Sequence, residues 1–389
     1  FGHPAEEMTM IAVTGTCGKT TTTYLLKAIL EQARGAKVGL IGTNQNMIGS
    51  DVIPTERTTP ESFEVQKLFR EMADAGCTHV VMETSSHALY LDRVYGVRYD
   101  VGIFTNLTQD HLDFHKTMEN YCDAKAILFR NCVTGVVNAD DPWTPRLLKD
   151  ADCKVMTYAE QADADLRAEN IVLSAGGIAF DAVSGAERVP IRVNIPGGFM
   201  VYNTLDVLGA ALALGISLEE SAAVLEKVPH VKGRVEIVPT PGKDYTILID
   251  YAHTPDSMVN VLQTVKEFAK GRTVAVFGCG GDRDRTKRPL MGKAAADWSD
   301  FAVVTTDNPR TEEPEAIIAD ILPGFDGSAT PYHVVVDRIE AIHWAMDHAE
   351  TDDVIVLCGK GHETYQEVNH VKHHMDEREI VADYLSSGR

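Results

Sequence analysis

Residues 12–23 read AVTGTCGKTTTT, a glycine turn followed by a lysine and a run of threonines. The apolar run Met10 to Val13 precedes the turn, and TTYLLKAILEQA after it repeats apolar residues at helical spacing up to Gly35. A strand, a glycine turn and a helix start together present unpaired backbone N–H groups and a positive dipole end to an anion. The stretch therefore predicts a phosphate-binding loop in an α/β domain.

The glycine spacing of this loop is shorter than the common phosphate-binding pattern, in which four residues separate two glycines ahead of Lys and Ser or Thr. Here two residues separate Gly15 from Gly18, and Val13 stands where the first glycine would be. We expect Lys19 to place a charge at the β- and γ-phosphates of a nucleotide and Thr20 to offer a hydroxyl to Mg²⁺. The alternative is an ordinary glycine-rich turn.

Length and composition narrow the class of protein. A chain of 389 residues is long for one core, so we expect more than one domain. The formal net charge of −21 argues against a nucleic-acid surface. No apolar run approaches the ~20 residues of a membrane span, and the first residues, FGHPAEEM, do not resemble a signal peptide. Seven cysteines without a CxxC pair favour reduced thiols and a cytoplasmic location.

Apolar runs alternate with helical patterns through the first half of the chain. The runs at 37–43, 78–85, 100–107 and 135–140 are typical of buried parallel strands, and helical patterns at 61–75 and 117–130 lie between them. Shorter β-like runs follow from about 154 to 195, and then two helical patterns at about 201–214 and 218–228. The pattern predicts a mostly parallel sheet for this first domain.

A second α/β series begins at residue 234, with apolar runs TILIDYAH, TVAVFGCGG, FAVVTTDNP, HVVVD and DVIVLCGKG. We expect a Rossmann-like C-terminal domain at 233–389, a central P-loop-type ATPase domain at 9–232 and a linker remnant at 1–8. Ligands of open α/β sheets bind outside the carboxyl ends of the strands. The unusual motifs stand at such ends: TGTCGKT, METSSH, TNLTQDH, DYAHTPD, GCGGDRD, TTDNPR and CGKGHE.

Several of these motifs carry residues suited to metal and anion chemistry. Glu83 ends an apolar strand, so it and Thr20 are candidate Mg²⁺ ligands, because Mg²⁺ takes hard oxygen ligands. Taken alone, Glu83 could equally cap a helix, His111 could be an ordinary loop or core histidine, and Lys125 a solvated helix lysine.

The second half offers charged residues that suit an amino acid. Arg283, Arg285 and Arg310 could hold carboxylates through bidentate pairs, and Glu363 could bind an amine. The alternative for each is a solvated surface charge.

Ten motifs in order give the chain a specific resemblance, which covers nearly its whole length. They are TGTCGKTTT, ERTTPES, METSSHAL, NLTQDHLDFH, TMENYCDAK, KGRVE, DYAHTPDS, GCGGDRDRTKRPLM, DNPRTEEP and GKGHETYQ. In this order they resemble the Mur ligase family, and within it the branch that adds the third residue of the peptidoglycan stem peptide. The shortened loop is that family's usual form. The resemblance covers the family's central and C-terminal domains, and we expect its UDP-binding domain to be missing apart from an exit linker, FGHP.

The resemblance implies roles for individual residues. The expected ATP contacts are Gly15, Thr16, Gly18, Lys19, Thr20, Thr21, Asn203, Arg234, Asp250 and His253. The expected catalytic residues are Lys19, Glu83, His111 and Lys125, and the expected metal ligands are Thr20, Glu83, His111 and Lys125, with Lys125 carbamylated by CO₂. The expected contacts to the muramoyl-dipeptide are Thr58, Thr59, Ser85 and Arg93. The expected pocket for the incoming amino acid is made by Arg283, Asp307, Asn308, Arg310, Gly359 and Glu363.

Two residues depart from the family pattern. Cys17 replaces the Asn usual in TGTNGKT, which puts details of the phosphate cradle in doubt. Met200 replaces the Asn usual in GxFNVYN, which puts helix or nucleotide contacts in doubt.

The activity that the resemblance implies is an ATP- and Mg²⁺-dependent amide ligation in cell-wall synthesis, carried out by a cytoplasmic monomer. Its substrates would be a UDP-linked muramoyl-dipeptide and meso-diaminopimelate. We expect Arg310 to select diaminopimelate over L-lysine, since lysine would leave that arginine without a carboxylate partner. The alternatives are a lysine-adding ligase, a folylpolyglutamate synthetase, against which DNPR, GKGHETYQ and ERTTP speak, and a nucleotide-binding module without ligase activity.

Overall fold

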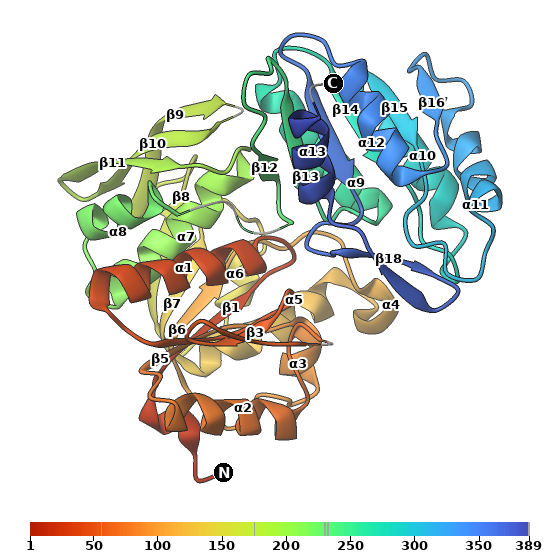
Figure 1. Ribbon diagram of the computed structural model, residues 1–389. Coiled ribbons are helices and arrows are strands. Elements are labelled where there is room, and N and C mark those ends of the chain that lie inside the picture. Colours follow the sequence, from red (N-terminus) through yellow and green to blue (C-terminus); the bar gives the residue numbers. More distant parts are fainter. Residues whose placement is uncertain (56, 175, 229–230, 232, 388–389) are drawn as a thin grey trace. The chain divides into compact units, whose positions relative to one another are not determined.

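A computed structural model describes residues 1–389 except positions 56, 175, 229–230, 232 and 388–389. The chain forms two compact units (Figure 1). The first comprises residues 1–172, 178–194 and 199–228, and the second comprises residues 173–177, 195–198 and 229–389. The expected domain boundary after residue 232 includes a position that lies outside the described residues, so those domain limits stay a prediction.

The first unit is built on an eleven-stranded sheet in the order β11-β10-β9-β8-β7-β6-β1-β5-β2-β3-β4. Its strands are β1 (Thr9–Thr14), β2 (Val38–Ile41), β3 (Asn46–Ile48), β4 (Asp51–Ile53), β5 (His79–Glu83), β6 (Tyr99–Phe104), β7 (Cys132–Asn138), β8 (Lys154–Ala159), β9 (Leu166–Ser174), β10 (Gly177–Ser184) and β11 (Glu187–Val193). Neighbouring strands along the stretch β9-β8-β7-β6-β1-β5-β2 of this order are parallel. The pairs β2–β3, β3–β4 and β10–β11 are antiparallel. The predicted parallel sheet is confirmed.

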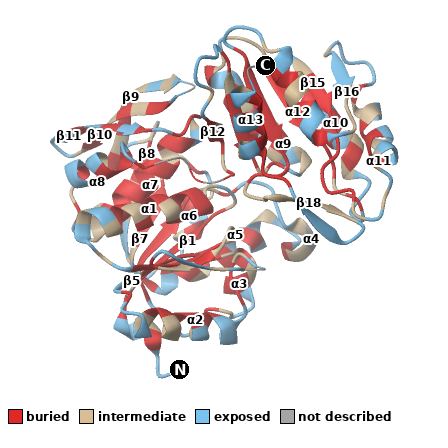
Figure 2. Ribbon diagram, in the orientation of Figure 1, coloured by how far each residue is buried: buried red, intermediate tan, exposed pale blue. Residues whose placement is uncertain are grey.

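Helices cover both faces of this sheet. They are α1 (Lys19–Arg34), α2 (Ser62–Asp74), α3 (Ser86–Tyr90), α4 (Leu112–His115), α5 (Met118–Ala126), α6 (Thr144–Leu147), α7 (Phe199–Ala213) and α8 (Leu218–Leu225), with 3₁₀ turns η1 (Pro4–Glu7) and η2 (Ile127–Arg130). Side chains alternate along a strand, so Met10 and Ala12 of β1 pack with α2 and α5 in one apolar cluster. On the other face α1 packs against α7, α8, β2 and β5 (Figures 1 and 2).

One local detail differs from the sequence expectation. The helix expected over 117–130 changes to 3₁₀ geometry at Ile127. Residues 1–8, expected to be a linker remnant, pack on the first unit: Glu7 pairs with Arg70 of α2 at 2.7 Å, and the Phe1 and Phe63 ring centroids are 5.3 Å apart.

The second unit contains a six-stranded sheet in the order β12-β13-β17-β14-β15-β16 and a two-stranded sheet, β18-β19. Its strands are β12 (Glu236–Val238), β13 (Thr246–Asp250), β14 (Thr273–Phe277), β15 (Phe301–Val304), β16 (Tyr332–Val334), β17 (Val354–Cys358), β18 (Tyr365–Val368) and β19 (Val371–His374). Only β12 is antiparallel to its neighbour in the larger sheet. This is the predicted Rossmann-like arrangement.

Helices again cover both faces of the second sheet. They are α9 (Pro255–Phe268), α10 (Lys287–Trp298), α11 (Pro314–Ile321), α12 (Arg338–Asp347) and α13 (Glu377–Ser386), with the 3₁₀ turn η3 (Leu322–Phe325). Alternate residues of β14 divide between two apolar clusters: Ala275 and Phe277 pack with α9, α10 and α11, whereas Val274 and Val276 pack with α12 and α13. Among the described residues, no helix combines the length and apolar character that a membrane crossing requires.

Candidate active site

The predicted motifs meet at one edge of each sheet because the strands that carry them are parallel neighbours. In the first unit β1 lies between β5 and β6, so the loops after these three strands share the carboxyl edge. In the second unit the same holds for β13, β17, β14 and β15. The clustering expected from the sequence is therefore confirmed within each unit.

The loop after β1 needs glycine at both of its glycine positions. Gly15 has a φ of 150°, and a Cβ there would lie 1.9 Å from the Thr105 Oγ1. Gly18 has a φ of 90°, and a Cβ there would lie 2.4 Å from the Asn203 Oδ1. Real Cβ atoms essentially never approach so closely, so the two glycines let the loop pack against the Thr105 and Asn203 side chains.

Lys19 opens helix α1 and folds back over the loop. Its Nζ donates to the carbonyl oxygens of Gly15 at 2.9 Å and Thr16 at 2.8 Å. The Thr22 N–H donates to the Gly18 carbonyl, so the N–H groups of Lys19, Thr20 and Thr21 precede the first helical hydrogen bond. A cation and unpaired helix-start donors thus point to the same place, which suits a phosphate group.

The departure at Cys17 leaves the loop backbone well held. The Cys17 N–H donates to the Asn106 Oδ1 at 3.0 Å, and its carbonyl accepts from Thr105 Oγ1 at 2.6 Å and Asn106 Nδ2 at 3.2 Å. These bonds use only the backbone of Cys17, whose side chain is exposed.

The departure at Met200 lies next to Asn203. The Met200 side chain is buried, and the Asn203 Nδ2 lies 3.8 Å from its sulfur. Asn203, expected to contact ATP, is buried against Gly18 of the loop. Its contact with ATP stays a prediction.

Lys125 is a buried lysine, not the solvated helix lysine that its sequence position alone suggests. Its side chain is 1% exposed, and its Nζ donates to the Gly15 carbonyl at 2.8 Å and lies 4.5 Å from the Tyr121 ring centroid. Burial, and secondarily the charge of Lys19, hold the Lys125 pKa well below its usual value. Among the described residues, no carboxylate lies within ion-pair distance of this amine.

Glu83 ends β5 and is almost fully buried. Its Oε1 accepts from the Thr43 N–H at 2.9 Å and its Oε2 accepts from the Thr43 Oγ1 at 2.8 Å. A Cβ at Gly42 would lie 2.6 Å from the Glu83 Oε1, so Gly42 makes room for the carboxylate. Thr43 and Gly42 were not singled out in the sequence.

The four residues expected to contact the dipeptide lie close to Glu83. The Thr59 Oγ1 donates to the Glu83 carbonyl at 2.8 Å and accepts from the Ser85 N–H at 3.1 Å, and the Thr59 carbonyl accepts from Arg93 at 3.2 Å. The Thr58 Oγ1 lies 3.0 Å from the Thr43 Oγ1. The structure thus brings these four residues together at one strand end.

His111 differs from the other expected catalytic residues because it is exposed. Its Nε2 lies 3.4 Å from the Asp110 Oδ2, and its backbone has a φ of 52° where α4 begins. Its ring also contacts His87, with centroids 4.9 Å apart.

The expected metal ligands, Thr20, Glu83, His111 and carbamylated Lys125, stay a prediction. Across the part of the chain that the structure describes, no group of three or more His, Cys, Asp and Glu side chains could hold a metal ion. The buried Glu83 carboxylate and the Thr20 hydroxyl at the helix start are hard oxygen donors, which fit Mg²⁺ held jointly with phosphate oxygens and water.

Arg234, Asp250 and His253 lie together in the second unit. Asp250 ends β13, and its carboxylate accepts from the N–H groups of Val235 at 2.8 Å and Ala252 at 2.9 Å, while burial raises its pKa. The Arg234 guanidinium lies 5.7 Å from the Tyr251 ring centroid, and the His253 Nδ1 lies 2.8 Å from the Tyr251 carbonyl.

A cavity of about 260 Å³ opens at the carboxyl edge of the second sheet. All six residues expected to form the amino-acid pocket line it: Arg283, Asp307, Asn308, Arg310, Gly359 and Glu363. Tyr251, Lys287 and Arg288, which the sequence did not single out, line it as well. Arg285 does not: it is exposed and pairs with Asp320 at 2.8 Å, so its candidate role is not supported.

Arg310 has a partner that the sequence argument did not anticipate. Its Nε donates to the Glu367 carboxylate at 3.1 Å and its NH1 donates to the Gly281 carbonyl at 2.7 Å. The premise that lysine would leave Arg310 without a carboxylate partner is therefore wrong, because Glu367 supplies one from the protein.

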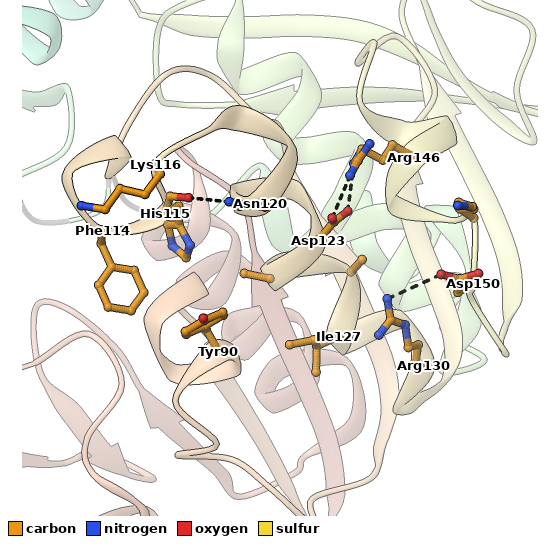
Figure 3. A pocket seen from close by; sticks show the side chains of 13 residues that line it. Tyr90, Phe114, His115, Lys116, Asn120, Asp123, Ile127, Arg130, Arg146 and Asp150 are labelled. Atoms are coloured by element: carbon orange, nitrogen blue, oxygen red, sulfur yellow. Dashed lines mark hydrogen bonds and ion pairs between the residues drawn. The ribbon is translucent and has the colours of Figure 1, made fainter.

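A larger cavity, of about 500 Å³, lies in the first unit beside α3, α4, α5 and η2 (Figure 3). None of the predicted site residues lines it. Arg146 forms two 2.8 Å bonds with Asp123, and Arg130 lies 3.8 Å from Asp150 (Figure 3). We place the chemistry at the strand ends, because the predicted site residues lie there and none of them lines this cavity.

A parallel sheet with a phosphate-binding loop, followed by a Rossmann-like sheet, defines a P-loop-type α/β protein with a second α/β domain. Residues 13–211 match the Mur ligase middle domain, and residues 233–361 match the Mur ligase, glutamate ligase domain. The chain belongs to the Mur ligase family.

Individual relatives narrow the comparison. UDP-N-acetylmuramoyl-L-alanyl-D-glutamate--2,6-diaminopimelate ligase of Clostridium botulinum is 50% identical over 386 residues, which are 99% of this chain and 79% of that protein. A solved structure of a ligase with the same name shares 35% identity with a TM-score of 0.76, covering 98% of this chain and 79% of that one. Folylpolyglutamate synthase of Mycobacterium tuberculosis, solved with ADP and AMPPCP, is 19% identical with a TM-score of 0.69, covers 92% of this chain and 90% of its own, and shares the fold.

Proposed function

We propose that this chain joins meso-2,6-diaminopimelate to UDP-N-acetylmuramoyl-L-alanyl-D-glutamate in an ATP-dependent reaction of peptidoglycan synthesis. Similarity to relatives of that name over 99% of the chain supports the reaction class. The reaction would take place in the cytoplasm, where ATP and the nucleotide-linked substrate are available.

The charged residues that line the 260 Å³ cavity are the observation that supports diaminopimelate as the amino acid. Diaminopimelate bears two carboxylates and two amino groups. Arg283 and Arg310 offer guanidinium donors for carboxylates, and Asp307 and Glu363 offer acceptors for an ammonium group. Both signs of charge converge on one cavity, as a zwitterion with charges at both ends requires.

The chemistry proceeds in two balanced steps. An oxygen of the substrate's D-glutamate side-chain carboxylate bonds to the γ-phosphorus of ATP as the bond to the bridging oxygen breaks, which gives an acyl phosphate and ADP. The amine nitrogen of diaminopimelate then bonds to the acyl carbon, phosphate leaves, and the nitrogen loses a proton to solvent. Amide formation is thereby driven by ATP cleavage.

The residues of the first unit stabilise charge in the first step. Lys19 and the N–H groups at the start of α1 would hold the phosphates, and fixed donors at a developing charge are the main catalytic resource in phosphoryl transfer. Glu83 and Thr20 would hold Mg²⁺, which neutralises phosphate charge when bound. Thr58, Thr59, Ser85 and Arg93 would orient the dipeptide beside them.

We infer further that Lys125 carries a carbamate in the active protein. Its neutral amine nitrogen would bond to the carbon of CO₂ and lose one proton, which turns a potential cation into a carboxylate-like anion. The nitrogen keeps one hydrogen, so the bond to the Gly15 carbonyl at 2.8 Å can persist. The site supports this modification because the amine is buried beside Lys19 and, among the described residues, pairs with no carboxylate.

Two experiments test these proposals. Phosphate release and product mass are measured with ATP, Mg²⁺ and the UDP-linked dipeptide, with meso-diaminopimelate or L-lysine added. We expect release and product to require diaminopimelate; equal rates with L-lysine, or ATP hydrolysis indifferent to the amino acid, would reject the assignment. For the carbamate, NMR after equilibration with ¹³C-bicarbonate should show a carbamate carbon in the wild type that is missing in Lys125→Met.

A further inference from the structure

Lys360 is a fully buried lysine that contacts residues lining the amino-acid cavity without lining it itself. It follows β17 between Gly359 and Gly361, and its side chain is 0% exposed. Its Nζ lies 2.6 Å from the Asn308 Oδ1, 3.2 Å from a Glu363 carboxylate oxygen and 3.8 Å from an Asp307 carboxylate oxygen. All three partners line the cavity.

The glycines on either side of Lys360 lie in tightly packed, left-handed backbone. Gly359 and Gly361 have φ values of 113° and 53°, and a Cβ at Gly361 would lie 2.6 Å from the Tyr251 Cβ. A buried lysine is unfavourable unless it is paired and hydrogen bonded. Its partners here are two carboxylates and an amide, so the ammonium in turn offsets the repulsion between Asp307 and Glu363.

Lys360 and the Glu367 N–H together determine how the Asn308 amide is oriented. The Asn308 Oδ1 accepts from the Lys360 Nζ and from the Glu367 N–H at 2.8 Å, which are both donors. The amide oxygen must therefore face these groups, and its Nδ2 donates to the Glu363 Oε2 at 3.0 Å. With the amide reversed, two donors would face each other and the bond to Glu363 would be lost.

The same contacts give the two carboxylate oxygens of Glu363 different hydrogen-bond partners. Its Oε2 accepts hydrogen bonds from the Lys360 Nζ and from the Asn308 Nδ2. Among the described residues, the Oε1 is approached by the Tyr365 hydroxyl, at 3.5 Å. A fixed Oε2 leaves the Oε1 to accept from a ligand in the cavity.

We propose that Lys360 is a positioning residue of the amino-acid site. It fixes the Asn308 amide and the Glu363 carboxylate so that the Glu363 Oε1 receives the ammonium group of the incoming amino acid. This inference rests on the proposed function, because it assumes that the cavity takes an amino acid with an ammonium group at that position.

The test compares the effect of replacing Lys360 on the KM for meso-diaminopimelate with its effect on the KM for ATP. Lys360→Met keeps a chain of similar length without the charge. We expect the KM for meso-diaminopimelate to rise roughly 10- to 100-fold, the range for a lost hydrogen bond to a charged group. The KM for ATP should change less than about twofold, since Lys360 contacts Asn308, Glu363 and Asp307, none of which is assigned to the nucleotide. His253, which is assigned to ATP, lines the same cavity, so the comparison of the two KM values is a direct test. Lys293→Met, at a 65% exposed lysine of the same unit, is the matched control and should leave both KM values unchanged.

A double-mutant cycle separates positioning from a structural role. If Lys360 acts through Glu363, then Lys360→Met should raise the KM for diaminopimelate several-fold less in a Glu363→Gln background than in the wild type. Additive effects would overturn the inference. So would an equal loss for ATP and diaminopimelate with a collapsed melting temperature in both Lys360→Met and Lys360→Gln. A wild type that ignores diaminopimelate would reject the proposed function instead, whereas a wild type that uses it beside an unaffected Lys360→Met would reject this inference alone.

Discussion

The Arg310 guanidinium is paired with the Glu367 carboxylate within the protein itself, Nε to Oε2 at 3.1 Å. The two residues are also joined by their backbones, because the Arg310 N–H donates to the Glu367 carbonyl at 3.0 Å. Arg310 has a φ of 53°, a left-handed conformation that the pairing helps to hold. One edge of the guanidinium is thus committed to Glu367, and a substrate carboxylate would meet the remaining donors.

Replacing Arg310 should impair use of diaminopimelate while sparing ATP. Arg310→Ala removes the charged donor proposed for the distal carboxylate, so we expect the KM for diaminopimelate to rise roughly 10- to 100-fold. Steady-state kinetics with each substrate varied in turn would measure this. Arg285→Ala is the matched control, since Arg285 belongs to the same run of motifs, is 63% exposed and lies outside the cavity lining. Equal effects of the two alanine variants would contradict the assignment.

Replacing Glu367 should sharpen the choice between diaminopimelate and lysine. Glu367→Gln keeps an oxygen that can accept from the Arg310 Nε but removes the internal charge. Lysine would then leave Arg310 without an anionic partner, whereas diaminopimelate would still supply one. We expect the ratio of kcat/KM values, diaminopimelate over lysine, to rise several-fold. A ratio that stays constant would show that Glu367 does not compete for Arg310.

The features that could be predicted from the sequence are those with a local pattern, namely the buried strands and the motifs that follow them. Continuous apolar runs identified β2, β5, β6 and β7 as buried parallel strands, and the position of each motif after such a run predicted that the motifs would meet at one edge. The fold and the grouping of candidate residues within each unit follow from these signals.

Pairings between residues far apart in the chain could not be predicted this way. Arg310 and Glu367 are separated by 57 positions, and only the sheet topology brings them together. Lys360 belongs to the motif CGKGHE, but no local pattern indicates that its side chain is buried beside Asp307. Asn203 reaches Gly18 only because α7 packs on α1, so its contact with the loop has no local signal.

The pair Arg288–Glu312 should make the second unit sensitive to acid. Arg288 is 1% exposed and pairs with Glu312 at 2.7 Å, which lowers the Glu312 pKa to about 2. Because the pKa of Glu312 in the folded protein lies below its ordinary value of 4.5, the stabilisation is complete above that pH and is lost as the pH falls toward 2. Glu312→Gln should lower stability at pH 7 by about 1–3 kcal/mol, since Arg288 keeps Asp320 as a partner.

Urea unfolding at pH 7 and pH 3 would check this prediction. Glu312→Gln should show a smaller loss of stability between the two pH values than the wild type. Glu315→Gln, at an exposed glutamate of the neighbouring helix α11, should behave like the wild type. An unchanged acid dependence in Glu312→Gln would mean that other carboxylates dominate.

Removing the Lys19 charge should abolish most turnover without unfolding the protein. Lys19→Ala deletes the cation proposed at the phosphates, and the expected loss in kcat is about 10²–10³-fold, as for other fixed donors at a developing charge. Circular dichroism and a melting curve would confirm the fold. Lys67→Ala, at a 58% exposed lysine of α2, should retain full activity. Undiminished turnover in Lys19→Ala would refute the phosphate-binding role.

Lys125 offers a test in which stability and activity should separate. Lys125→Met removes a buried amine that makes one hydrogen bond, and its acceptor, the Gly15 carbonyl, keeps the Lys19 Nζ at 2.9 Å. We therefore expect a stability change within about 1 kcal/mol. Turnover should nevertheless be lost, because methionine cannot carry a carbamate. Lys125→Ala should be equally inactive and indifferent to added bicarbonate, yet a short carboxylate such as acetate should restore part of its rate by occupying the vacated space. An active alanine variant, or rescue by bicarbonate alone, would return Lys125 to a purely structural role.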